Sequence, residues 1–328
     1  SQFAVTLNGS SLLAKFDTAT LKKGAHVKLR TFVTKPEHKP GHAPPVPRLD
    51  LYPLPHSEVV LNPEVGTYVL ASGLNNGATV WVYNNQSPSY MQQSLTLLSL
   101  STDGVFAAPQ IAPTTATRRI EFVGDSITAA TNLRRPRGDP EFGIPEAPTC
   151  GDYGLFSDYP LSYMALLCQA FGANCSTIAW GGKGMCARPP TPLREHPFAQ
   201  TSPAVCADKN CCDDGTTMPE YFQQRLAYES AETFQPYTFA SSGFAPDAIV
   251  INLGTNDYSH CRRMPGGECE AGFAQAFTKT YVDFMRNATR WYDKPDIHFF
   301  CGVGPITINY WPAVEAAVVQ AKAQGLKA

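Results

Sequence analysis

The chain carries the stretch Ile120-Glu-Phe-Val-Gly-Asp-Ser-Ile-Thr128, in which a short apolar segment runs into a polar turn. Residues 120–123 predict a strand, and a helix is expected to start just after Ser126. In open α/β sheets, ligands bind beyond the carboxyl ends of the strands, where this serine would project its hydroxyl. Ser126 is therefore a candidate nucleophile whose own N–H can donate to an oxyanion. The alternative is that Asp125 and Ser126 only cap a helix.

Two further motifs also follow predicted strands. The first is Ile178-Ala-Trp-Gly-Gly-Lys-Gly-Met185, whose glycines allow a substrate to approach the backbone N–H groups closely. The second is Ile249-Val-Ile-Asn-Leu-Gly-Thr-Asn-Asp257, in which Asn256 can donate its amide to an oxyanion and Asp257 can cap the next segment or orient Asn256. A simple turn and an Asx turn are the alternatives. Three such motifs in one sheet are less expected by chance than any single one.

The part of the chain after Arg118 alternates between strand and helix patterns, which predicts an α/β domain with a parallel sheet. An insertion at about residues 187–246, rich in cysteine and proline, interrupts this order. The expected strands after the first are residues 177–180, 248–253 and 298–303, and the expected helices are residues 159–171, 271–292 and 312–324.

Residues 1–117 have a different rhythm of short strands without a good helix, which predicts a β-sandwich. We expect one domain over 1–117 and a second over 118–328. Asn75-Asn76-Gly77 predicts a hairpin turn, and the proline-rich residues 35–55 predict an irregular excursion. The expected strands are residues 3–7, 11–16, 26–33, 59–61, 67–71, 79–83 and 94–100.

The composition describes an ordinary globular protein, with 43% hydrophobic residues and a formal net charge of −2. The absence of any block of like charges argues against nucleic acid as a partner. No apolar run approaches the roughly 20 residues that a membrane-spanning helix needs. The chain begins Ser-Gln-Phe, which we interpret as the start of a mature, processed product.

Ten cysteines, all after residue 149, favour disulfides formed in an oxidising compartment. A metal site is the alternative, because Cys206, Cys211 and Cys212 cluster, but the usual paired zinc-ligand spacings are missing. Four glycosylation sequons also favour secretion: Asn8, Asn85, Asn174 and Asn287. The remaining cysteines are Cys150, Cys168, Cys175, Cys186, Cys261, Cys269 and Cys301.

Gly124-Asp-Ser126, the glycines at 181–184 and Gly254-Thr-Asn-Asp257 resemble three sequence blocks of the SGNH, or GDSL, hydrolase superfamily. The resemblance implies a flavodoxin-like α/β/α sandwich and a serine nucleophile without metal or organic cofactor. It assigns the nucleophile to Ser126 and the oxyanion hole to Ser126, Gly184 and Asn256. Gly182 is the alternative glycine, and Asp125 and Asp257 are supporting residues.

The phrases Arg119-Ile-Glu-Phe-Val-Gly-Asp-Ser-Ile-Thr128 and Leu253-Gly-Thr-Asn-Asp-Tyr-Ser259, together with a preceding β-sandwich (jelly-roll-like), resemble carbohydrate esterase family two. This resemblance implies an esterase that removes acetyl or other short acyl groups from a polysaccharide or glycan, through an acyl-enzyme on Ser126. The cysteines and the sequons add the expectation that this esterase is secreted. Two alternatives stay open: a non-catalytic carbohydrate-binding or structural glycoprotein on a hydrolase scaffold, and a glycan O-acyltransferase.

The resembled family carries its catalytic base in an Asp-x-x-His motif after a fifth strand, and no such motif follows Gly325. Asp257-Tyr-Ser-His260 matches the pattern, but Asp257 already belongs to the third motif. We therefore expect the catalytic histidine outside this segment, either on a C-terminal fragment retained as a second chain or on a segment that was lost. His298 is expected to be structural, and His38, His42, His56 and His196 lie in loops without a motif.

Overall fold

The structure is a computed structural model, and the elements form two compact units, Ser1–Ala116 with Ala130–Gly172, and Thr117–Ala129 with Ala173–Ala328. The proline-rich residues 35–55 and most of the insertion lie outside the described residues. The residues that the structure describes are 2–17, 27–34, 56–61, 66–84, 96–107, 118–131, 159, 162–186, 217–224, 237–239, 242–262, 272–304 and 310–328.

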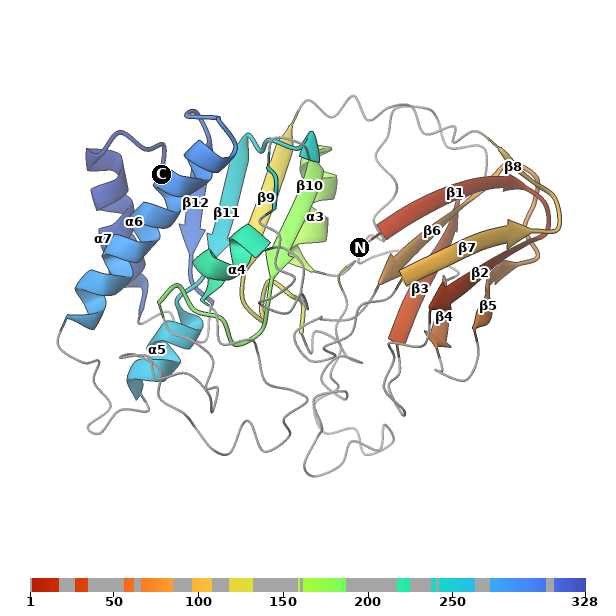
Figure 1. Cartoon of the computed structure of the whole chain (residues 1–328), viewed down its shortest axis with the longest axis horizontal. Helices are drawn as coiled ribbons and strands as arrows, with labels where there is room; N and C mark the ends of the chain where they lie inside the picture. The colour runs from red at the N-terminus through yellow and green to blue at the C-terminus, as the bar shows by residue number, and fades with distance from the viewer. Residues whose placement is uncertain are drawn as a thin grey trace. The chain divides into compact units, whose positions relative to one another are not determined.

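The first unit contains two antiparallel sheets (Figure 1). The expected strands are present, each within a few residues of its predicted bounds, and the three-residue strand β8 was not predicted. The larger sheet has the order β4 (His56–Leu61), β3 (Val27–Thr34), β6 (Ala78–Asn84), β1 (Gln2–Asn8) and β8 (Val105–Ala107). The smaller sheet has the order β5 (Thr67–Ser72), β2 (Ser11–Asp17) and β7 (Thr96–Thr102).

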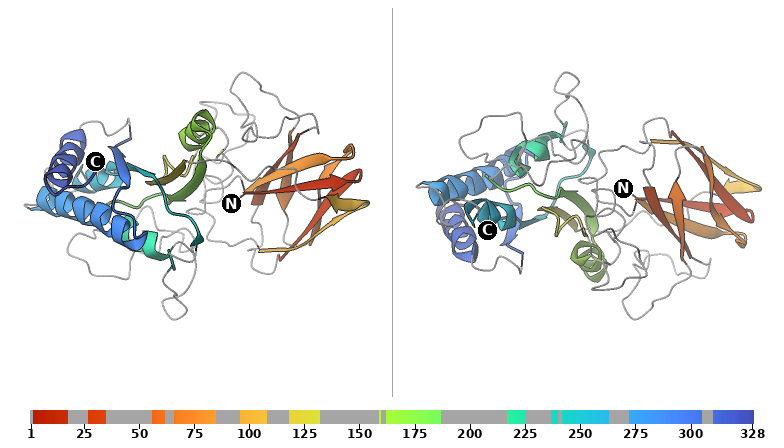
Figure 2. Two further views of the ribbon diagram at one scale, coloured as in Figure 1. Left: turned by 90° about the horizontal axis from the view of Figure 1, so that it is seen from above. Right: turned by 90° about the horizontal axis from the view of Figure 1, so that it is seen from below.

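The two sheets of this unit share one hydrophobic cluster, and Figure 2 shows their strands from above and below. Alternation in β2 buries Leu12, Ala14 and Phe16, because every second side chain of a strand points to the same face. Leu7 of β1 and Val80 of β6 belong to the same cluster and come from the other sheet. The period-two pattern in the sequence therefore corresponds to burial between two sheets.

The predicted turn at Asn75-Asn76-Gly77 is present, but it does not close a hairpin. Gly77 has a φ of +79°, and the Ala78 N–H donates to the Asn75 carbonyl over 3.0 Å. The flanking strands β5 and β6 belong to different sheets, so the turn carries the chain from one sheet to the other. The Gly77 N–H donates to the Leu7 carbonyl, which ties the turn to β1. Sequence pattern identifies such a turn without identifying which strands pair.

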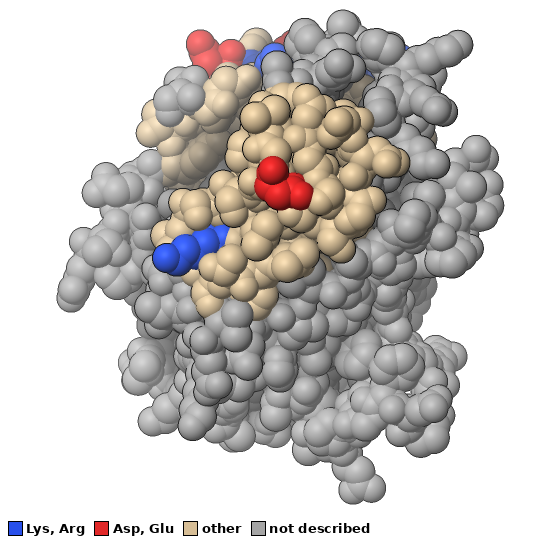
Figure 3. Space-filling view, turned by 90° about the vertical axis from the view of Figure 1, so that its right-hand side faces the viewer, with Lys and Arg blue, Asp and Glu red and all other residues tan. Residues whose placement is uncertain are grey.

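The end of this unit at β8 exposes apolar side chains, with Val105 63% and Phe106 47% exposed. Figure 3 views the right-hand side of Figure 1, and the described surface there is mostly uncharged.

The second unit is built on a parallel four-stranded sheet with the order β10 (Asn174–Ala179), β9 (Arg119–Gly124), β11 (Ala248–Asn252) and β12 (His298–Gly302). β9 comes first in the chain among these four strands and lies inside the sheet, as a flavodoxin-like order requires. At the outer edge of β12, Lys327 forms a parallel bridge with His298, and the Phe299 N–H donates to the Lys327 carbonyl over 2.7 Å.

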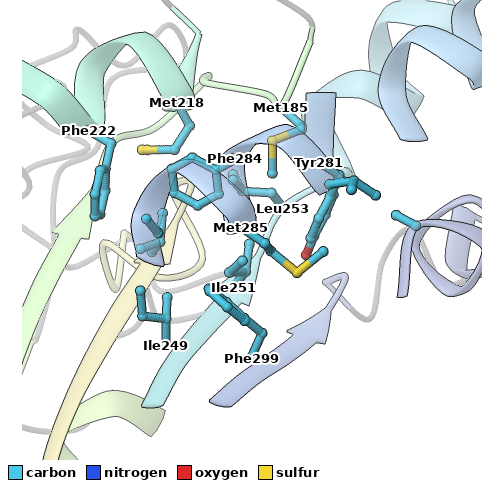
Figure 4. Packing of buried hydrophobic residues seen from close by; sticks show 14 of the residues in the cluster. Met185, Met218, Phe222, Ile249, Ile251, Leu253, Tyr281, Phe284, Met285 and Phe299 are labelled. Carbon is cyan, nitrogen blue, oxygen red and sulfur yellow. The ribbon is translucent and has the colours of Figure 1, made fainter. Parts of the chain in front are cut away.

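The helix α6 (Phe273–Trp291) packs its apolar face against this sheet (Figure 4). Figure 4 shows Phe284 and Met285 of α6 facing Ile251 of β11 and Phe299 of β12. All four side chains are at most 3% exposed and belong to one hydrophobic cluster. Helix α7 (Trp311–Ala323) packs on α6 through the same cluster, with Val314, Ala317 and Ala321 buried.

The sequence predicted three helices within a few residues and missed two. Helix α3 (Tyr163–Phe171) is capped by Ser162, whose side chain accepts from the Ala165 N–H, and it ends at Gly172 as expected. The two missed helices are α4 (Met218–Gln224), inside the insertion, and α5 (Thr255–Arg262), directly after the third motif. No described helix is long and apolar enough to cross a membrane.

Candidate active site

The three motifs run along strands of the parallel sheet and end at the same edge of that sheet. In the strand register, Gly124 of β9 lies opposite Ala179 of β10 and Asn252 of β11, and Asn252 lies opposite Gly302 of β12. The strands are parallel, so this row marks their shared carboxyl edge. Ser126 follows the row by two residues and Asn256 by four. The motifs therefore meet where α/β sheets bind their ligands.

The first loop, residues 125–131, is a turn and not the helix that the sequence predicted to start after Ser126. It keeps one helical hydrogen bond, from the Ala129 N–H to the Asp125 carbonyl over 2.8 Å. The Ile127 N–H donates to Asp125 Oδ1 over 2.9 Å. Ala130 has a φ of +56°, which a continuing right-handed helix does not allow. Ser126 itself is half-buried.

A glycine is required for steric reasons at position 124, where this loop leaves β9. A Cβ atom at this position would lie 2.0 Å from Thr128 Oγ1 and 2.9 Å from the Asn252 carbonyl oxygen. Real Cβ atoms essentially never approach other heavy atoms so closely. Because Gly124 has no side chain, Thr128 of the loop and the Asn252 carbonyl of β11 can both lie close to it.

Asp125 is fully buried, and burial raises its pKa to about 7. The negative charge of Asp257 raises the pKa further, while hydrogen bonds from the Ile127 N–H and the Thr255 side chain oppose the rise. The carboxyl group of Asp125 is therefore largely protonated in mildly acidic solution. This buried acid connects the first loop with the third motif.

This raised pKa predicts a pH-dependent stability. The folded protein binds the Asp125 proton more tightly than the unfolded chain, whose aspartate pKa is near 3.8, so the free energy of unfolding falls as pH rises through 7. Between pH 5 and pH 8, the wild type should lose about 2.5 kcal/mol more than Asp125→Asn, which does not titrate. Urea unfolding of both proteins at the two pH values measures the difference. Equal losses in the two proteins would contradict the assignment.

The second loop, residues 181–186, is called the glycine loop below. It starts from Trp180, whose N–H donates to the Gly124 carbonyl over 3.0 Å. Gly182 has a φ of +88°, which glycine adopts without steric cost. The Lys183 side chain is fully buried, and its Nζ lies 5.4 Å from the centre of the Trp180 ring and 5.0 Å from that of Tyr221.

Helix α4 of the insertion supports the glycine loop, a role that the sequence reasoning missed. The Met218 N–H donates to the Gly184 carbonyl over 2.9 Å, and the Tyr221 ring meets the Trp180 ring edge-on. The Thr217 N–H and hydroxyl both donate to Glu220 Oε2 at the start of this helix. A Thr-x-x-Glu pattern is a recognised helix-start signal, and it could have identified α4.

The third motif bonds directly to the glycine loop. Asn256 Nδ2 donates to the Lys183 carbonyl over 2.9 Å. Asp257 is fully buried, and its Oδ2 and Oδ1 accept from the Met185 and Cys186 N–H groups, each over 2.8 Å. Both residues stand in the first turn of α5, which Figure 1 draws beyond the arrowhead of β11. The structure thus brings the second and third motifs into contact.

Of the seven histidines, the structure describes the backbone of His56, His260 and His298. His298 is exposed at the amino end of β12, opposite the edge that carries Ser126, and His56 begins β4. His260 lies in α5, four residues after Asn256. His38, His42 and His196 lie outside the described residues. Among the described residues, no group of three or more His, Cys, Asp or Glu is placed to hold a metal ion.

The cysteines divide into two kinds. Cys168 and Cys175 are disulfide-bonded, as the sequence predicted for an oxidising compartment. Cys186 and Cys301 are free thiols, and burial raises the pKa of Cys186 to about 12 and that of Cys301 to about 11. The side chain of Cys261 and the residues Cys150, Cys206, Cys211, Cys212 and Cys269 lie outside the described part of the chain.

A parallel sheet with a serine, a glycine loop and an asparagine at its carboxyl edge is compatible with a serine hydrolase built on a flavodoxin-like sheet. The profile of the family described as GDSL-like lipase/acylhydrolase matches residues 120–322, which is most of the chain. The chain belongs to this family.

Several known proteins are similar to the chain. Cellulase/esterase CelE of Acetivibrio thermocellus is 28% identical over 270 residues, which are 79% of this chain and 25% of that protein. The chain thus spans about a quarter of the curated relative that it matches.

Among solved structures, an acetyl xylan esterase from the rumen bacterium Butyrivibrio proteoclasticus has a TM-score of 0.67 at 16% identity, over 99% of this chain and 78% of the other. A carbohydrate esterase family two enzyme with a carbohydrate-binding domain from Corynascus thermopiles (Myceliophthora fergusii) has a TM-score of 0.65 at 22% identity, over 97% and 80%. A family two carbohydrate esterase from Clostridium thermocellum, solved with cellohexaose, gives 0.65 at 21% identity, over 99% and 79%. The chain therefore has the SGNH hydrolase fold.

Proposed function

We propose that this protein is a serine esterase that removes acetyl or other short acyl groups from a polysaccharide or glycan. The hydrogen bonds that join the third motif to the glycine loop at the edge carrying Ser126 are the observation on which the proposal depends. In the proposed reaction the Ser126 hydroxyl attacks the ester carbonyl, the alcohol leaves, and water hydrolyses the acyl-enzyme. Hydrogen-bond donors in the loops that follow the strands stabilise the oxyanion that forms during acylation and again during deacylation.

The proposed oxyanion donors are the Ser126 N–H, a glycine N–H and Asn256 Nδ2. We favour Gly182 over Gly184 as the glycine. A trans peptide is planar, so the Lys183 carbonyl and the Gly184 N–H point in opposite directions. The carbonyl accepts from Asn256, and the Gly184 N–H is therefore directed away from the Asn256 amide. A single oxyanion cannot accept from both groups in this arrangement.

The exposure of the two glycines supports the same choice. Gly184 is buried, and its carbonyl is bonded to the Met218 N–H. Gly182 is half-buried, and a glycine is needed there because of its positive φ. Asn256 Nδ2 carries two hydrogens, so its bond to Lys183 leaves one for an oxyanion.

The proposed base is a histidine supplied from outside residues 1–328, on a C-terminal fragment or segment. A base must come within hydrogen-bond reach of the Ser126 hydroxyl, and His298 stands at the other end of its strand. His260 is the alternative base on α5.

The proposed setting is extracellular. The disulfide-bonded Cys168 and Cys175 support it, because such bonds form and persist in oxidising compartments. Asn8 and Asn174 are exposed and Asn287 is half-buried, and we propose them as glycosylation sites with Asn85, which lies outside the described residues. We also propose that residues 1–117 form a jelly-roll-like β-sandwich domain before the hydrolase domain at 118–328, on the basis of the hydrophobic cluster that the two sheets share.

A fluorophosphonate probe tests the proposed activity, because it reacts with serines that a base and an oxyanion hole activate. The intact gene product should be labelled, with the modified peptide containing Ser126, and should release acetate from acetylated xylan or another acetylated plant polysaccharide. Labelling without acetate release to water, but with acyl transfer to an added glycan, would identify an acyltransferase. A folded protein that is not labelled would overturn the proposal in favour of a non-catalytic glycan-binding protein.

A further inference from the structure

Asp257 occupies an unusual place for an acidic side chain. It is fully buried, yet both of its carboxylate oxygens accept backbone hydrogen bonds, Oδ2 from Met185 and Oδ1 from Cys186, each over 2.8 Å. Hydrogen bonds to an ionised acceptor are roughly twice as strong as those between neutral groups. The negative charge of Asp257 also raises the pKa of Asp125 in the first loop, after the larger effect of burial.

Asn256, the residue before Asp257, also binds the glycine loop. Asn256 Nδ2 donates to the Lys183 carbonyl over 2.9 Å, so two successive residues of α5 bind three successive peptide units of the glycine loop. The other end of this segment is bonded to β9 through the Trp180 N–H and the Gly124 carbonyl. Gly182 lies between these two attachments. Glycines are conformationally permissive, so the direction of the Gly182 N–H depends on how its ends are held.

We propose that Asp257 is a positioning residue that sets the geometry of the oxyanion hole by clamping the glycine loop through Met185 and Cys186. This inference rests on the proposed esterase function. Asp257 does not touch the ester in this role; it acts through the loop that carries the glycine donor. The sequence suggested that Asp257 caps the next segment or orients Asn256, whereas the structure directs both carboxylate oxygens to the glycine loop.

The kinetic test compares Asp257→Asn with the wild type in hydrolysis of a soluble acetyl ester, 4-nitrophenyl acetate. The amide keeps the size of the side chain but replaces one acceptor with an NH₂ group that faces a backbone N–H. A displacement of about 1 Å in such a site can cost roughly 100-fold in rate. We expect kcat and kcat/KM to fall together by 30- to 100-fold, with KM changed less than threefold. Unchanged kcat in a folded variant would overturn the proposal.

Glu121→Gln is the matched control for general destabilisation. Glu121 is equally buried, and its carboxylate also accepts two hydrogen bonds, from Tyr292 Oη over 2.6 Å and from Ser176 Oγ over 3.0 Å. It lies three residues before the row at Gly124, about 10 Å along the strand. The control should lose stability and keep kcat within about twofold. If it loses as much kcat as Asp257→Asn at equal loss of Tm, the specific role of Asp257 is refuted.

Amide hydrogen exchange in the wild-type protein tests the clamp without any substitution. The amides of Met185 and Cys186 should exchange at the slow rate of the sheet residues Val250 and Ile251. Exchange at the rate of an open loop would overturn the clamp. This measurement does not require catalysis, so it separates a failure of the inference from a failure of the proposed function, which the fluorophosphonate experiment reports.

Discussion

Replacing Ser126 with alanine is expected to abolish acetyl-ester hydrolysis, with a fall in kcat of at least about 10⁴-fold. The substitution removes the oxygen that would form the acyl-enzyme. Only the oxyanion hole and substrate binding then remain to assist direct attack of water on the ester. Ser126 is half-buried in a turn held by Asp125, so loss of the hydroxyl should change stability little.

The measurement is the initial rate of acetate release together with the Tm of each variant. Ser242→Ala provides a matched control, because Ser242 is an exposed serine of the same unit whose hydroxyl donates to the Phe239 carbonyl over 2.7 Å. The control should keep wild-type kcat. Substantial activity in Ser126→Ala would show that another group attacks the ester, and the assignment of the nucleophile would fall.

Asn256→Ala is expected to lower kcat by roughly 100- to 1,000-fold, since loss of one oxyanion donor costs on the order of 3 kcal/mol of transition-state stabilisation. The structure gives the substitution a second consequence, because the Asn256 amide also holds the Lys183 carbonyl. Both effects reduce stabilisation of the transition state more than binding of the ester. KM should therefore change much less than kcat.

Asn256→Asp distinguishes a hydrogen-bond donor from a residue that only fills space. It is nearly isosteric, but its carboxylate cannot donate and places a negative charge beside the developing oxyanion. Its kcat should be at least as low as that of Asn256→Ala. Retention of activity in Asn256→Asp, measured with the same acetyl ester, would contradict a donor role for this side chain.

The sequence predicted the sheet of the second unit well because its strands are short, apolar and followed by recognisable turns. Residues 120–123 and 248–253 correspond closely to β9 and β11. Strand pairing across a distance was not predictable in the same way. The turn at Gly77 illustrates this, because its local chemistry is the same whether the next strand pairs with the previous one or joins another sheet.

The sequence predicted which residues form the candidate site, but not the hydrogen bonds that join its loops. Ser126, the glycine loop and Asn256 follow strands that end together, and their proximity follows from a parallel sheet. The helix expected after Ser126 was wrong, because Ala130 has a positive φ that a right-handed helix does not allow, and Thr128 lies so close to Gly124 that a Cβ there would collide with it. The bonds of Asp257 to Met185 and Cys186 join residues more than 70 positions apart. No local pattern reports such a contact.

The missing side chain at Gly124 also changes what the Gly-Asp-Ser signature means. A methyl group there would collide both with Thr128 on the same loop and with the main chain of β11. Substitution of Thr128 by a smaller residue would remove only the first collision. No substitution of a single neighbouring side chain would therefore allow alanine at position 124. The glycine of the signature is thus needed because β9 and β11 lie so close together, whereas its serine is the proposed nucleophile. A library that diversifies this motif should treat the glycine as part of the scaffold and reserve variation for positions whose limits are chemical.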